Sequence, residues 1–441
     1  MNRTRRDFLS KSGKIIAGAS LIPTITPFSI SAGGKISANE KVIVGLIGCN
    51  GMGFEDLKNF LKIPGVECAA LCDVDQGVLD RRNADLAKLG GKKAELFNDY
   101  RKLIDRKDID VVIIGSPDHW HCLPLVNSCE AGKDIYCEKP LANSIQECDI
   151  MEKAAQKYNR VVQVGQWQRS GPHWKNAIDY VYSGQLGKIR TVKTWAYQGW
   201  MKPVPVLADE PAPQGVDYDF WLGPATQRPF NRNRFHFNFR WFWDYAGGLM
   251  TDWGVHIIDF GLLGMKATTP VSVMASGGKF AYPDDASETP DTLQAIYEFD
   301  GFTMIWEHAT GINGGPFGRD HGVAYIGNNG TLVVDRGGWE VIPEKENGKP
   351  KIEAIPVQRG PGGDLELHVR NFIDCIKSRN KPAADISVAA NTARVAHMGN
   401  IAFKTGRKIY WDKSSNQFSN DQKANELIKA NYRSPWKFPV V

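Results

Sequence analysis

The sequence predicts an α/β protein whose N-terminal part forms a doubly wound parallel sheet, with helices on both faces. Two observations predict this fold. Short runs that are almost wholly apolar recur along the chain, and stretches with helical spacing separate them. Parallel strands are buried on both faces, so they appear in a sequence as continuous apolar runs rather than alternating ones.

Strands and helices alternate from residue 41 to residue 166. The apolar runs cover 41–48, 66–75, 109–117, 133–140 and 160–166. The stretches with helical spacing cover 54–63, 75–88, 124–132 and the residues leading to Lys157. Because the strands run parallel, their carboxyl ends meet at one edge of the sheet, where such sheets bind ligands.

The length and charge of the chain restrict its function. A chain of 441 residues with 42% hydrophobic residues can bury a large core and suggests two or three domains. The formal charge is +5, but residues 1–32 hold five basic residues and one acidic residue. The rest of the chain is therefore close to neutral, which argues against nucleic-acid binding.

Residues 1–32 have the anatomy of an export signal. A basic start precedes the apolar stretch 15–23, which is too short to span a bilayer, and small residues follow at 29–32. The start, TRRDFLSK, resembles the twin-arginine consensus of bacterial export signals. We therefore expect a periplasmic protein that folds around its cofactor before export. The alternative is a disordered basic tail on a cytosolic protein.

Eight cysteines would make an exported protein a candidate for disulfides. Seven of them fall in apolar strand-like or helix-like segments, and none has CxxC spacing. We therefore interpret most of them as small buried side chains.

The turn after the first apolar run is a variant of the dinucleotide-binding fingerprint. It reads Gly48, Cys49, Asn50, Gly51, Met52, Gly53. Glycines let the chain approach a pyrophosphate, whose charge then lies at a helix N-terminus. Asp73 ends the second run, where a carboxylate accepts hydrogen bonds from the ribose of NAD and repels the extra phosphate of NADP. The motif predicts NAD rather than NADP, the alternative being a glycine turn in a domain without a dinucleotide.

The later strand ends supply further candidates for cofactor binding. A lysine at the end of a buried strand is costly unless an acceptor or an anion faces it, which singles out Lys139. The candidates at these ends are Ser116, Pro117, His119, His121, Glu138, Lys139 and Gln166.

The stretch TDWGVHIID at 251–259 places Asp252 and His256 four positions apart in an apolar run. If the segment is helical, both side chains lie on one face. A proton-handling pair and an ordinary helix contact both fit this spacing. No third ligand, HExxH or CxxC supports a metal, so we expect none.

These motifs together resemble the Gfo/Idh/MocA family of NAD(P)-dependent oxidoreductases, in its exported bacterial branch. The resemblance rests on the glycine turn, Asp73, the strand-end EKP at 138–140 and the D-x-x-x-H pair. It covers about 41–412 and extends to VDYDFWLGPA at 216–225 and HVRNFIDCIKSRNKP at 368–382.

The resemblance implies an active site and a second domain. Lys139 would lie near the nicotinamide and the substrate hydroxyl, with Asp252 and His256 completing the site. Imidazole titrates near neutrality, so His256 suits the acid/base role and Lys139 suits polarising the substrate oxygen. The resemblance also implies a C-terminal α/β domain with a large, mainly antiparallel sheet that covers the nicotinamide and makes subunit contacts. Its sheet-like stretches are 189–198, 270–277, 291–298, 301–309 and 321–343.

The segment 195–243 is rich in aromatic, Arg and Asn residues, which suits a sugar with apolar C–H faces and many hydroxyls. The alternative is that most of these aromatics belong to the core or to a dimer interface. The substrate candidates are Trp167, Arg169, His236 and Arg240. The closing stretch predicts a helix and then an extended arm that packs on another subunit.

We therefore expect four segments: a signal peptide at 1–32, an NAD-binding Rossmann domain at 41–165, a substrate-binding and oligomerisation domain at 166–412, and a helix with an arm at 413–441. The expected function is an exported oxidoreductase that moves hydride between a sugar or polyol and tightly bound NAD. One alternative is an NAD-dependent glycoside hydrolase that oxidises the sugar transiently, and another is a non-catalytic sugar or nucleotide sensor. We expect a homo-oligomer without a membrane span.

Overall fold

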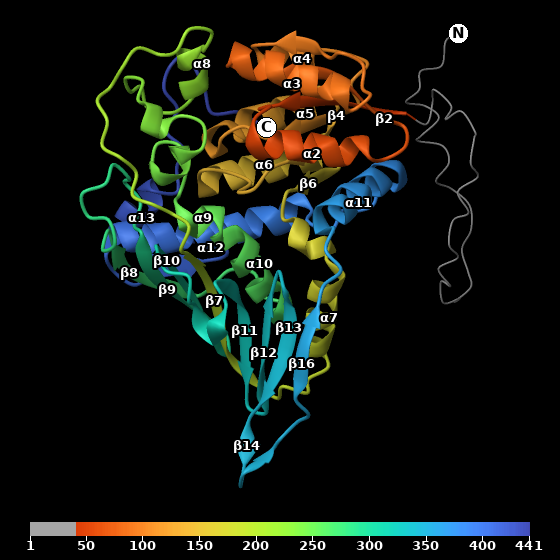
Figure 1. Ribbon diagram of the computed structural model, residues 1–441. Helices are drawn as coiled ribbons and strands as arrows, with labels where there is room; N and C mark the ends of the chain where they lie inside the picture. Colours follow the sequence, from red (N-terminus) through yellow and green to blue (C-terminus); the bar gives the residue numbers. More distant parts are fainter. Residues whose placement is uncertain (1–40) are drawn as a thin grey trace.

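The computed structural model describes residues 41–441 and contains two sheets joined by a layer of helices (Figure 1). The export signal expected at 1–32 lies outside the described residues and stays a prediction.

The first sheet is parallel throughout, with strand order β3-β2-β1-β4-β5-β6. Its strands are β1 (Val42–Ile47), β2 (Val66–Cys72), β3 (Glu95–Phe97), β4 (Val111–Ile114), β5 (Asp134–Cys137) and β6 (Val162–Val164). The predicted doubly wound sheet is confirmed. The strand β3 was not predicted, because three residues with one exposed acid carry no apolar run.

Five helices connect these strands: α2 (Gly51–Leu61), α3 (Gln76–Lys88), α4 (Tyr100–Ile104), α5 (Cys122–Glu130) and α6 (Ile145–Lys157). Three of them begin at a side chain that accepts a hydrogen bond from a backbone N–H of the first turn, namely Asp75, Asp99 and Ser144. The helix α2 begins at Asn50 without such a side-chain bond. The first N–H groups of α2 therefore remain available for a ligand.

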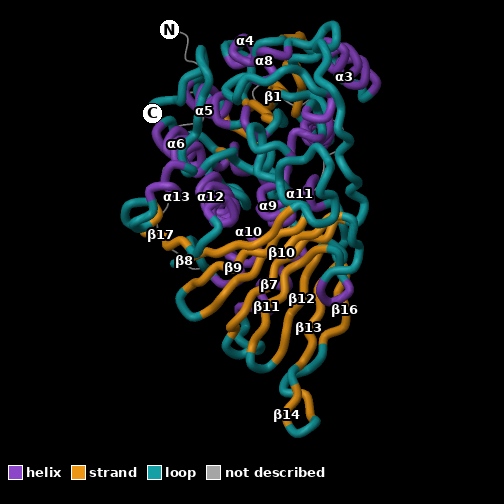
Figure 2. The backbone as a smooth tube through the Cα atoms, turned by 90° about the vertical axis from the view of Figure 1, so that its left-hand side faces the viewer, coloured by secondary structure: helices purple, strands orange, loops and turns teal. Residues whose placement is uncertain are grey.

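The second sheet has ten strands in the order β16-β13-β12-β11-β7-β10-β9-β8-β17-β18, antiparallel except where β7 meets β10. Its strands are β7 (Ile189–Gln198), β8 (Ser272–Gly278), β9 (Thr292–Phe299), β10 (Phe302–Thr310), β11 (His321–Gly327), β12 (Gly330–Asp335), β13 (Gly338–Pro343), β16 (Ile355–Arg359), β17 (Ile409–Asp412) and β18 (Gln417–Phe418). A small hairpin of β14 (Lys345–Glu346) and β15 (Lys349–Pro350) forms the tip in Figure 2. The predicted large, mainly antiparallel sheet is confirmed, and the stretch 321–343 divides into three strands.

Three helices cover one face of the second sheet. They are α7 (Pro172–Tyr182), α10 (Gly254–Met265) and α12 (Ile386–Thr405). Figures 1 and 2 show α10 and α12 between the two sheets, where α12 also packs on α6. The helix α11 (Asp364–Ser378) packs on α2, so its residues Phe372 and Ile373 complete the core of the first domain. The chain thus returns to the N-terminal domain after building the second sheet.

A long connection over residues 199–248 lies against the carboxyl edge of the first sheet. It contains α8 (Tyr218–Leu222) and the 3-10 turns η4 (Arg232–Arg234) and η5 (Asn238–Trp241), and it leads into α9 (Leu249–Asp252). Its buried aromatics, among them Trp221, Phe235 and Tyr245, form a core of their own. This segment therefore supplies an aromatic wall for whatever binds at the sheet edge.

The C-terminal arm follows α13 (Gln422–Glu426) and packs on its own chain. The Trp436 ring meets the Trp120 ring at 4.9 Å and the Phe220 ring at 5.3 Å, while the Tyr432 hydroxyl donates to Glu147 at 2.7 Å. These residues contact the N-terminal domain and the 199–248 connection of the same chain, and the expected packing on another subunit stays a prediction.

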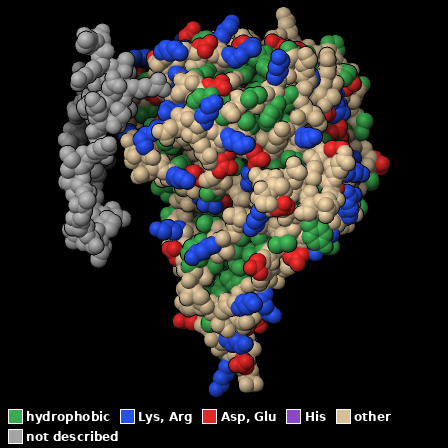
Figure 3. All heavy atoms as spheres, turned by 180° about the vertical axis from the view of Figure 1, so that it is seen from behind, with side chains coloured by type: hydrophobic (Ala, Val, Ile, Leu, Met, Phe, Trp, Pro, Cys, Tyr) green, Lys and Arg blue, Asp and Glu red, His purple; other side chains and the backbone are tan. Residues whose placement is uncertain are grey.

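The surface and the cysteines agree with a globular protein. On the face shown in Figure 3, basic and acidic side chains are interspersed, without a broad region of one sign. All eight cysteines lie in the described part of the chain and are buried free thiols, as the sequence predicts. No helix within residues 41–441 is long and apolar enough to cross a membrane.

Candidate active site

The glycine turn between β1 and α2 is shaped by close backbone contacts. Gly48 has φ of +80°, and a Cβ there would lie 2.5 Å from the backbone nitrogen of Ser116. A Cβ on Gly53 would collide with the carbonyl oxygen of Gly48. These glycines bring β1, β4 and α2 together and leave the N-terminus of α2 open, as a dinucleotide requires.

Asn50 stands where the fingerprint usually has a glycine, and its side chain is held by the neighbouring helix. Its Oδ1 accepts from Arg82 at 3.4 Å and from Arg81 at 3.5 Å, both on α3. The turn therefore tolerates a side chain at this position, and two guanidinium groups lie beside it.

Asp73 is fixed at the end of β2. Its Oδ2 accepts from the backbone N–H of Cys49 at 2.8 Å, and its Oδ1 accepts from that of Asp75 at 3.1 Å. Burial raises the pKa of Asp73 to about 6. The same carboxylate thus shapes the glycine turn and offers its remaining lone pairs to a ligand.

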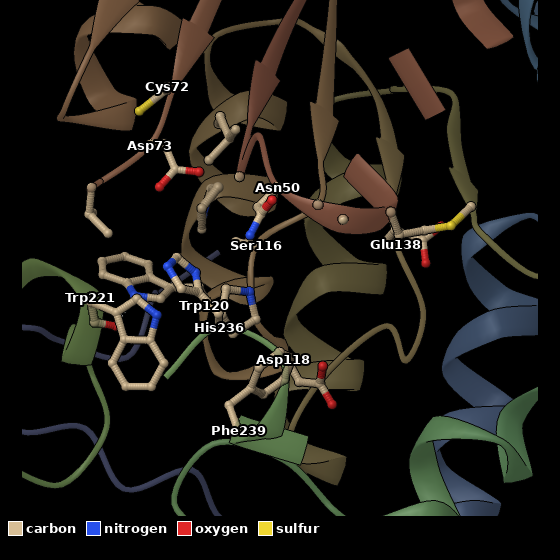
Figure 4. A pocket seen from close by; sticks show the side chains of 18 of the residues that line it. Asn50, Cys72, Asp73, Ser116, Asp118, Trp120, Glu138, Trp221, His236 and Phe239 are labelled. Atoms are coloured by element: carbon tan, nitrogen blue, oxygen red, sulfur yellow. Dashed lines mark hydrogen bonds between the residues drawn. The ribbon is translucent and has the colours of Figure 1, made fainter. Parts of the chain in front are cut away.

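A cavity of about 360 Å³ runs along the carboxyl edge of the first sheet, from the glycine turn to the EKP segment. Figure 4 shows Asp73 and Trp221 on one side of it and Glu138 on the other, with Asn50 and Ser116 between them. Its wall includes these predicted residues: Gly48, Asn50, Gly51, Met52, Asp73, Ser116, Pro117, Glu138, Lys139, His236 and Arg240. The Ser116 hydroxyl is buried and has no hydrogen-bond partner within residues 41–441, so the wall holds a polar group suited to a ligand.

Two predicted cofactor residues support the wall from behind. His119 contacts the carbonyl oxygen of Trp221 at 3.0 Å. His121 lies between the carbonyl oxygens of Pro140 at 2.7 Å and Ser116 at 2.8 Å. These histidines join the strand-end loops to one another, so their role in the structure is positional.

Lys139, Asp252 and Arg240 form an ion cluster where the cavity meets the second domain. Lys139 Nζ lies 2.6 Å from Asp252 Oδ1, and Arg240 Nε lies 3.2 Å from the same oxygen. Although burial favours the neutral acid, these two cations hold the pKa of Asp252 well below its usual range. Two positive charges thus share one carboxylate, and Lys139 is fixed at the cavity wall.

His256 lies beside this cluster with a neutral ring. Burial, and then the positive charges of Lys139 and Arg336, hold its pKa well below the usual range. Its Nδ1 is buried and has no hydrogen-bond partner in the part of the chain that the structure describes. The neutral ring has a free lone pair that can accept a proton, and the neighbouring cations lower its basicity.

The helical turn expected to join Asp252 and His256 is interrupted. The helix α9 ends at Asp252 and α10 begins at Gly254, with Trp253 between them. Asp252 turns to Lys139 and Arg240 rather than to the His256 ring. The hydrogen bonds of Asp252 thus go to Lys139 and Arg240, while its charge still acts on the His256 ring.

The fold agrees with a comparison against family models. The Gfo/Idh/MocA model described as "Oxidoreductase family, C-terminal alpha/beta domain" matches residues 179–438. The model of the same family described as "NAD-binding Rossmann fold" matches residues 42–166. The chain belongs to the Gfo/Idh/MocA oxidoreductase family.

The names of several similar proteins refer to sugars. Alpha-N-acetylgalactosaminidase of Shewanella oneidensis is 35% identical over 204 residues, which are 43% of this chain and 44% of that protein. The chain therefore spans less than half the length of the curated relatives that it matches. Levoglucosan dehydrogenase in complex with NADH and levoglucosan has a TM-score of 0.64 at 18% identity, covering 84% of this chain and 99% of that one. Aldose-aldose oxidoreductase from Caulobacter crescentus has a TM-score of 0.64 at 20% identity, covering the same shares. These two structures share the fold.

In this Gfo/Idh/MocA protein, the other predicted residues after β6 contact the helix α10 and do not line the cavity. Gln166 contacts the carbonyl oxygen of Val255 at 3.4 Å, and Trp167 packs at 6.0 Å from the His256 ring. Arg169 forms a buried bidentate pair with Asp259 at 2.6 and 2.8 Å, which commits its guanidinium to α10. The predicted role of Arg169 in substrate binding is therefore not supported, because its guanidinium is used in this ion pair.

His236, predicted to bind substrate, lies in the cavity wall near the end of β2. Its Nε2 is 3.2 Å from the Asp75 carboxylate. This position is on the Asp73 side of the cavity, away from the Lys139 cluster, and suits contact with the cofactor.

A buried carboxyl pair beneath the Rossmann turn was not predicted. Asp56 faces inward from α2 and is fully buried, and neither of its carboxyl oxygens has a hydrogen-bond partner among the described residues. Burial, and then the neighbouring Glu138 carboxyl, raise the pKa of Asp56 well above its usual range, and burial also raises that of Glu138. The two acids therefore hold at least one proton between them at neutral pH.

The residues missed by sequence reasoning include most of the aromatic wall. Phe220, Trp221, Phe237 and Phe239 line the cavity from the long connection, and Trp120 lines it from the end of β4. The aromatic richness of 195–243 signalled a binding surface, but it did not indicate which rings face a ligand.

The residues present fit a bound NAD. The open N-terminus of α2, the Asp73 carboxylate and the cavity that ends at Lys139 match the phosphates, a ribose and the nicotinamide end of a dinucleotide. Within residues 41–441 no group of three or more metal-binding side chains occurs.

Replacing Asp73 with Ser is expected to weaken NAD binding about tenfold and to favour NADP relative to NAD, because a ribose acceptor and a repelling charge are lost. Dissociation constants of both cofactors would measure this. Asp80→Ser, which removes an acid on the exposed side of α3, is the control and should change neither. A wild type that already prefers NADP would show that Asp73 does not face the ribose.

Proposed function

We propose that the protein oxidises or reduces a sugar or polyol at a hydroxyl-bearing carbon, using NAD that stays bound. The observation that carries the proposal is the ion cluster of Lys139, Asp252 and Arg240 beside neutral His256, at the end of the cavity that begins at the glycine turn. The sugar-directed names of similar proteins support this substrate class.

Each residue has a role in this proposal. NAD supplies a carbon that takes a hydride from the substrate or returns it. His256 accepts the hydroxyl proton as the carbonyl forms and gives it back in the reverse direction. Lys139 polarises the oxygen that becomes the carbonyl, and Asp252 fixes the ammonium group for that contact. Trp167 borders His256 and limits the access of water.

A glycoside hydrolase is the second candidate, and the names of the curated relatives favour it. In that reaction the sugar is oxidised, the aglycone is eliminated, water adds, and the sugar is reduced again on the same NAD. The net reaction consumes water and leaves the cofactor unchanged. A third possibility, a sensor without turnover, is disfavoured because Lys139, Asp252 and His256 are all present and brought together.

The experiment starts from protein purified without added cofactor. We expect its absorbance to show close to one nicotinamide dinucleotide per chain, because the aromatic wall and the second domain enclose the cavity. A panel of sugars and nitrophenyl glycosides is then added. NADH that accumulates indicates a net oxidoreductase, whereas released nitrophenol without NADH indicates the hydrolase. Neither signal with any compound would support the sensor.

We also propose that the protein is periplasmic and exported by the twin-arginine route, as the sequence of residues 1–32 indicates. Free NAD is scarce outside the cytoplasmic membrane, so an exported enzyme must keep its cofactor through each cycle. Protein that is isolated empty and that needs stoichiometric added NAD would contradict both retention and export.

The protein is proposed to form a homo-oligomer through the outer face of the second sheet. Met274 on β8 and Ile296 on β9 are cross-strand partners, and each is 42% exposed. Tyr410 on β17 is exposed on the same sheet. An apolar strip of this kind is typical of subunit contacts. A single-chain mass in light scattering would contradict this assembly.

A further inference from the structure

Arg336 occupies an unusual place in the turn between β12 and β13. Its guanidinium lies 4.4 Å from the ring centre of Trp167 and 4.6 Å from that of Trp253. Two indole rings thus flank one cation, an arrangement in which its electrostatic attraction to the rings replaces part of its hydration. We call these three side chains the Arg336 sandwich.

Within residues 41–441 no acid lies at ion-pair distance from the guanidinium, although Asp252, Asp320 and Asp364 attract it from farther away. Its Nη2 donates to the amide oxygen of Gln168 at 3.3 Å, and its buried Nε has no acceptor among the described residues. No carboxylate forms an ion pair with Arg336 in the described part of the chain. By contrast, Arg319, two residues before β11, pairs with Asp335 and Glu340. Burial of the unpaired charge lowers the pKa of Arg336 to about 10, a sign that its charge is poorly compensated.

The sandwich adjoins the proposed acid/base. The Trp167 and Trp253 rings lie 6.0 and 6.3 Å from the His256 ring. All three side chains of the sandwich are only partly buried, so a molecule can reach them from solvent. Trp167 and Trp253 therefore each contact both Arg336 and the ring of His256, the residue proposed to handle the substrate proton.

The charges around His256 favour an anion. Lys139 and Arg240 share the single carboxylate of Asp252, and Arg336 adds a third positive charge. Asp118 lies nearby, but burial raises its pKa to about 7, so at neutral pH it is only partly ionised. Three cations thus surround His256, and the carboxylates of Asp320 and Asp364 act on Arg336 only from beyond ion-pair distance. A guanidinium held at two indole rings keeps a planar fork of donors, which suits a carboxylate.

We propose that Arg336 binds a carboxylate of the substrate, so the preferred substrate class is a sugar acid rather than a neutral sugar. This inference rests on the proposed function, since it names the substrate class of the same site. A bound carboxylate would also offset the charge that Arg336 exerts on His256. The competing explanation is that Arg336 only ties the β12–β13 turn to Gln168.

The test compares matched pairs of probes on the NAD-loaded protein: D-glucuronate with D-glucose, D-galacturonate with D-galactose, and D-gluconate with D-glucitol. Binding is measured by calorimetry, separately from NAD reduction. We expect the wild type to bind at least one acid about tenfold more tightly than its neutral partner, as for a charge-assisted contact. In Arg336→Gln this preference should fall to about twofold or less, while the affinity for the neutral sugar stays nearly unchanged.

Arg359→Gln is the matched control. Arg359 is an exposed arginine on β16, in the strand that pairs with β13, and its removal takes the same charge from the same sheet. It should keep the preference of the wild type. Arg336→Lys keeps the charge but not the planar donors, and an intermediate preference is expected.

Each outcome decides the inference. Equal affinity of the wild type for acid and neutral sugar, no binding of any acid, or an unchanged preference in Arg336→Gln would overturn it, and the first two need no variant to fold. A preference for acids that persists without NAD reduction would uphold carboxylate recognition while contradicting the proposed oxidoreductase activity. A lower melting temperature in Arg336→Gln with an unchanged preference would favour the purely structural explanation.

Discussion

Replacing His256 or Lys139 with alanine is expected to lower turnover by at least two orders of magnitude, about 3 kcal/mol of transition-state stabilisation. His256→Ala removes the proposed proton acceptor. Lys139→Ala removes the group that polarises the substrate oxygen and leaves Asp252 paired with Arg240 alone. Steady-state rates with the substrate found in the panel measure both effects.

The fold is expected to survive both changes, because neither side chain fills the hydrophobic core. The far-ultraviolet circular dichroism should therefore stay close to wild type in both variants, and NAD binding should do so in His256→Ala. Lys153→Ala, at an exposed position on α6, is the matched control and should retain full activity. Near-normal turnover in both His256→Ala and Lys139→Ala would remove the catalytic assignment.

The pH profile supplies a second readout of His256. Since burial and two neighbouring cations hold its pKa well below the usual range, the ring stays neutral on the acid side of pH 6.5. The acid limb of kcat/KM for alcohol oxidation should therefore lie clearly below pH 6.5. A limb at the ordinary histidine value would place a different group in the acid/base role.

The N-terminal domain was predictable because its strands are buried on both faces. Runs such as VVII in β4 contain no polar residue to obscure the pattern, and helices with side-chain caps separate them. The short strand β3 and the division of 321–343 into three strands were not predictable in the same way. Their boundaries depend on turns at Asn328 and Arg336 that only the pairing of β11, β12 and β13 makes visible.

Residue types at strand ends located the cofactor side of the site, but contacts between distant segments could not be read from the sequence. Lys139 and Asp252 were singled out separately, and their 2.6 Å contact joins positions 113 residues apart. Arg169 was named as a substrate candidate, yet a buried acid on α10 engages it. Arg336 was overlooked since an arginine in a turn is usually a solvated surface residue.

The buried pair of Asp56 and Glu138 is expected to make folding stability depend on pH. In the unfolded chain both acids titrate near their ordinary values of about 4. In the folded protein burial raises the pKa of each, so the folded state retains protons that the unfolded state has released. The stability contribution is therefore full below about pH 4 and is lost as the pH rises through the folded-state values, with a slope of about 1.4 kcal/mol per pH unit for each retained proton.

Asp56→Asn is expected to reduce this slope. The Asn amide has nearly the same shape as the carboxyl group and can donate a hydrogen bond to ionised Glu138. Because the amide does not titrate, the folded variant retains one proton fewer than the folded wild type. Urea unfolding of wild type and variant between pH 5 and 8, at one fixed NAD concentration, measures the difference. The variant should gain stability relative to wild type as the pH rises.

Other buried acids, among them Asp73, Asp118 and Glu147, also have raised pKa values and contribute to the slope of both proteins. The difference between wild type and variant therefore isolates Asp56, whereas the absolute slope does not. Asp80→Asn removes an exposed acid on α3 that does not act on Asp56 and should leave the slope unchanged. Parallel stability curves for wild type and Asp56→Asn would mean that Asp56 is ionised in the folded protein, with its charge compensated by water or by a group that moves toward it. The α2 helix would then carry a buried negative charge beneath the glycine turn, which would weaken rather than support the binding of a pyrophosphate at its N-terminus.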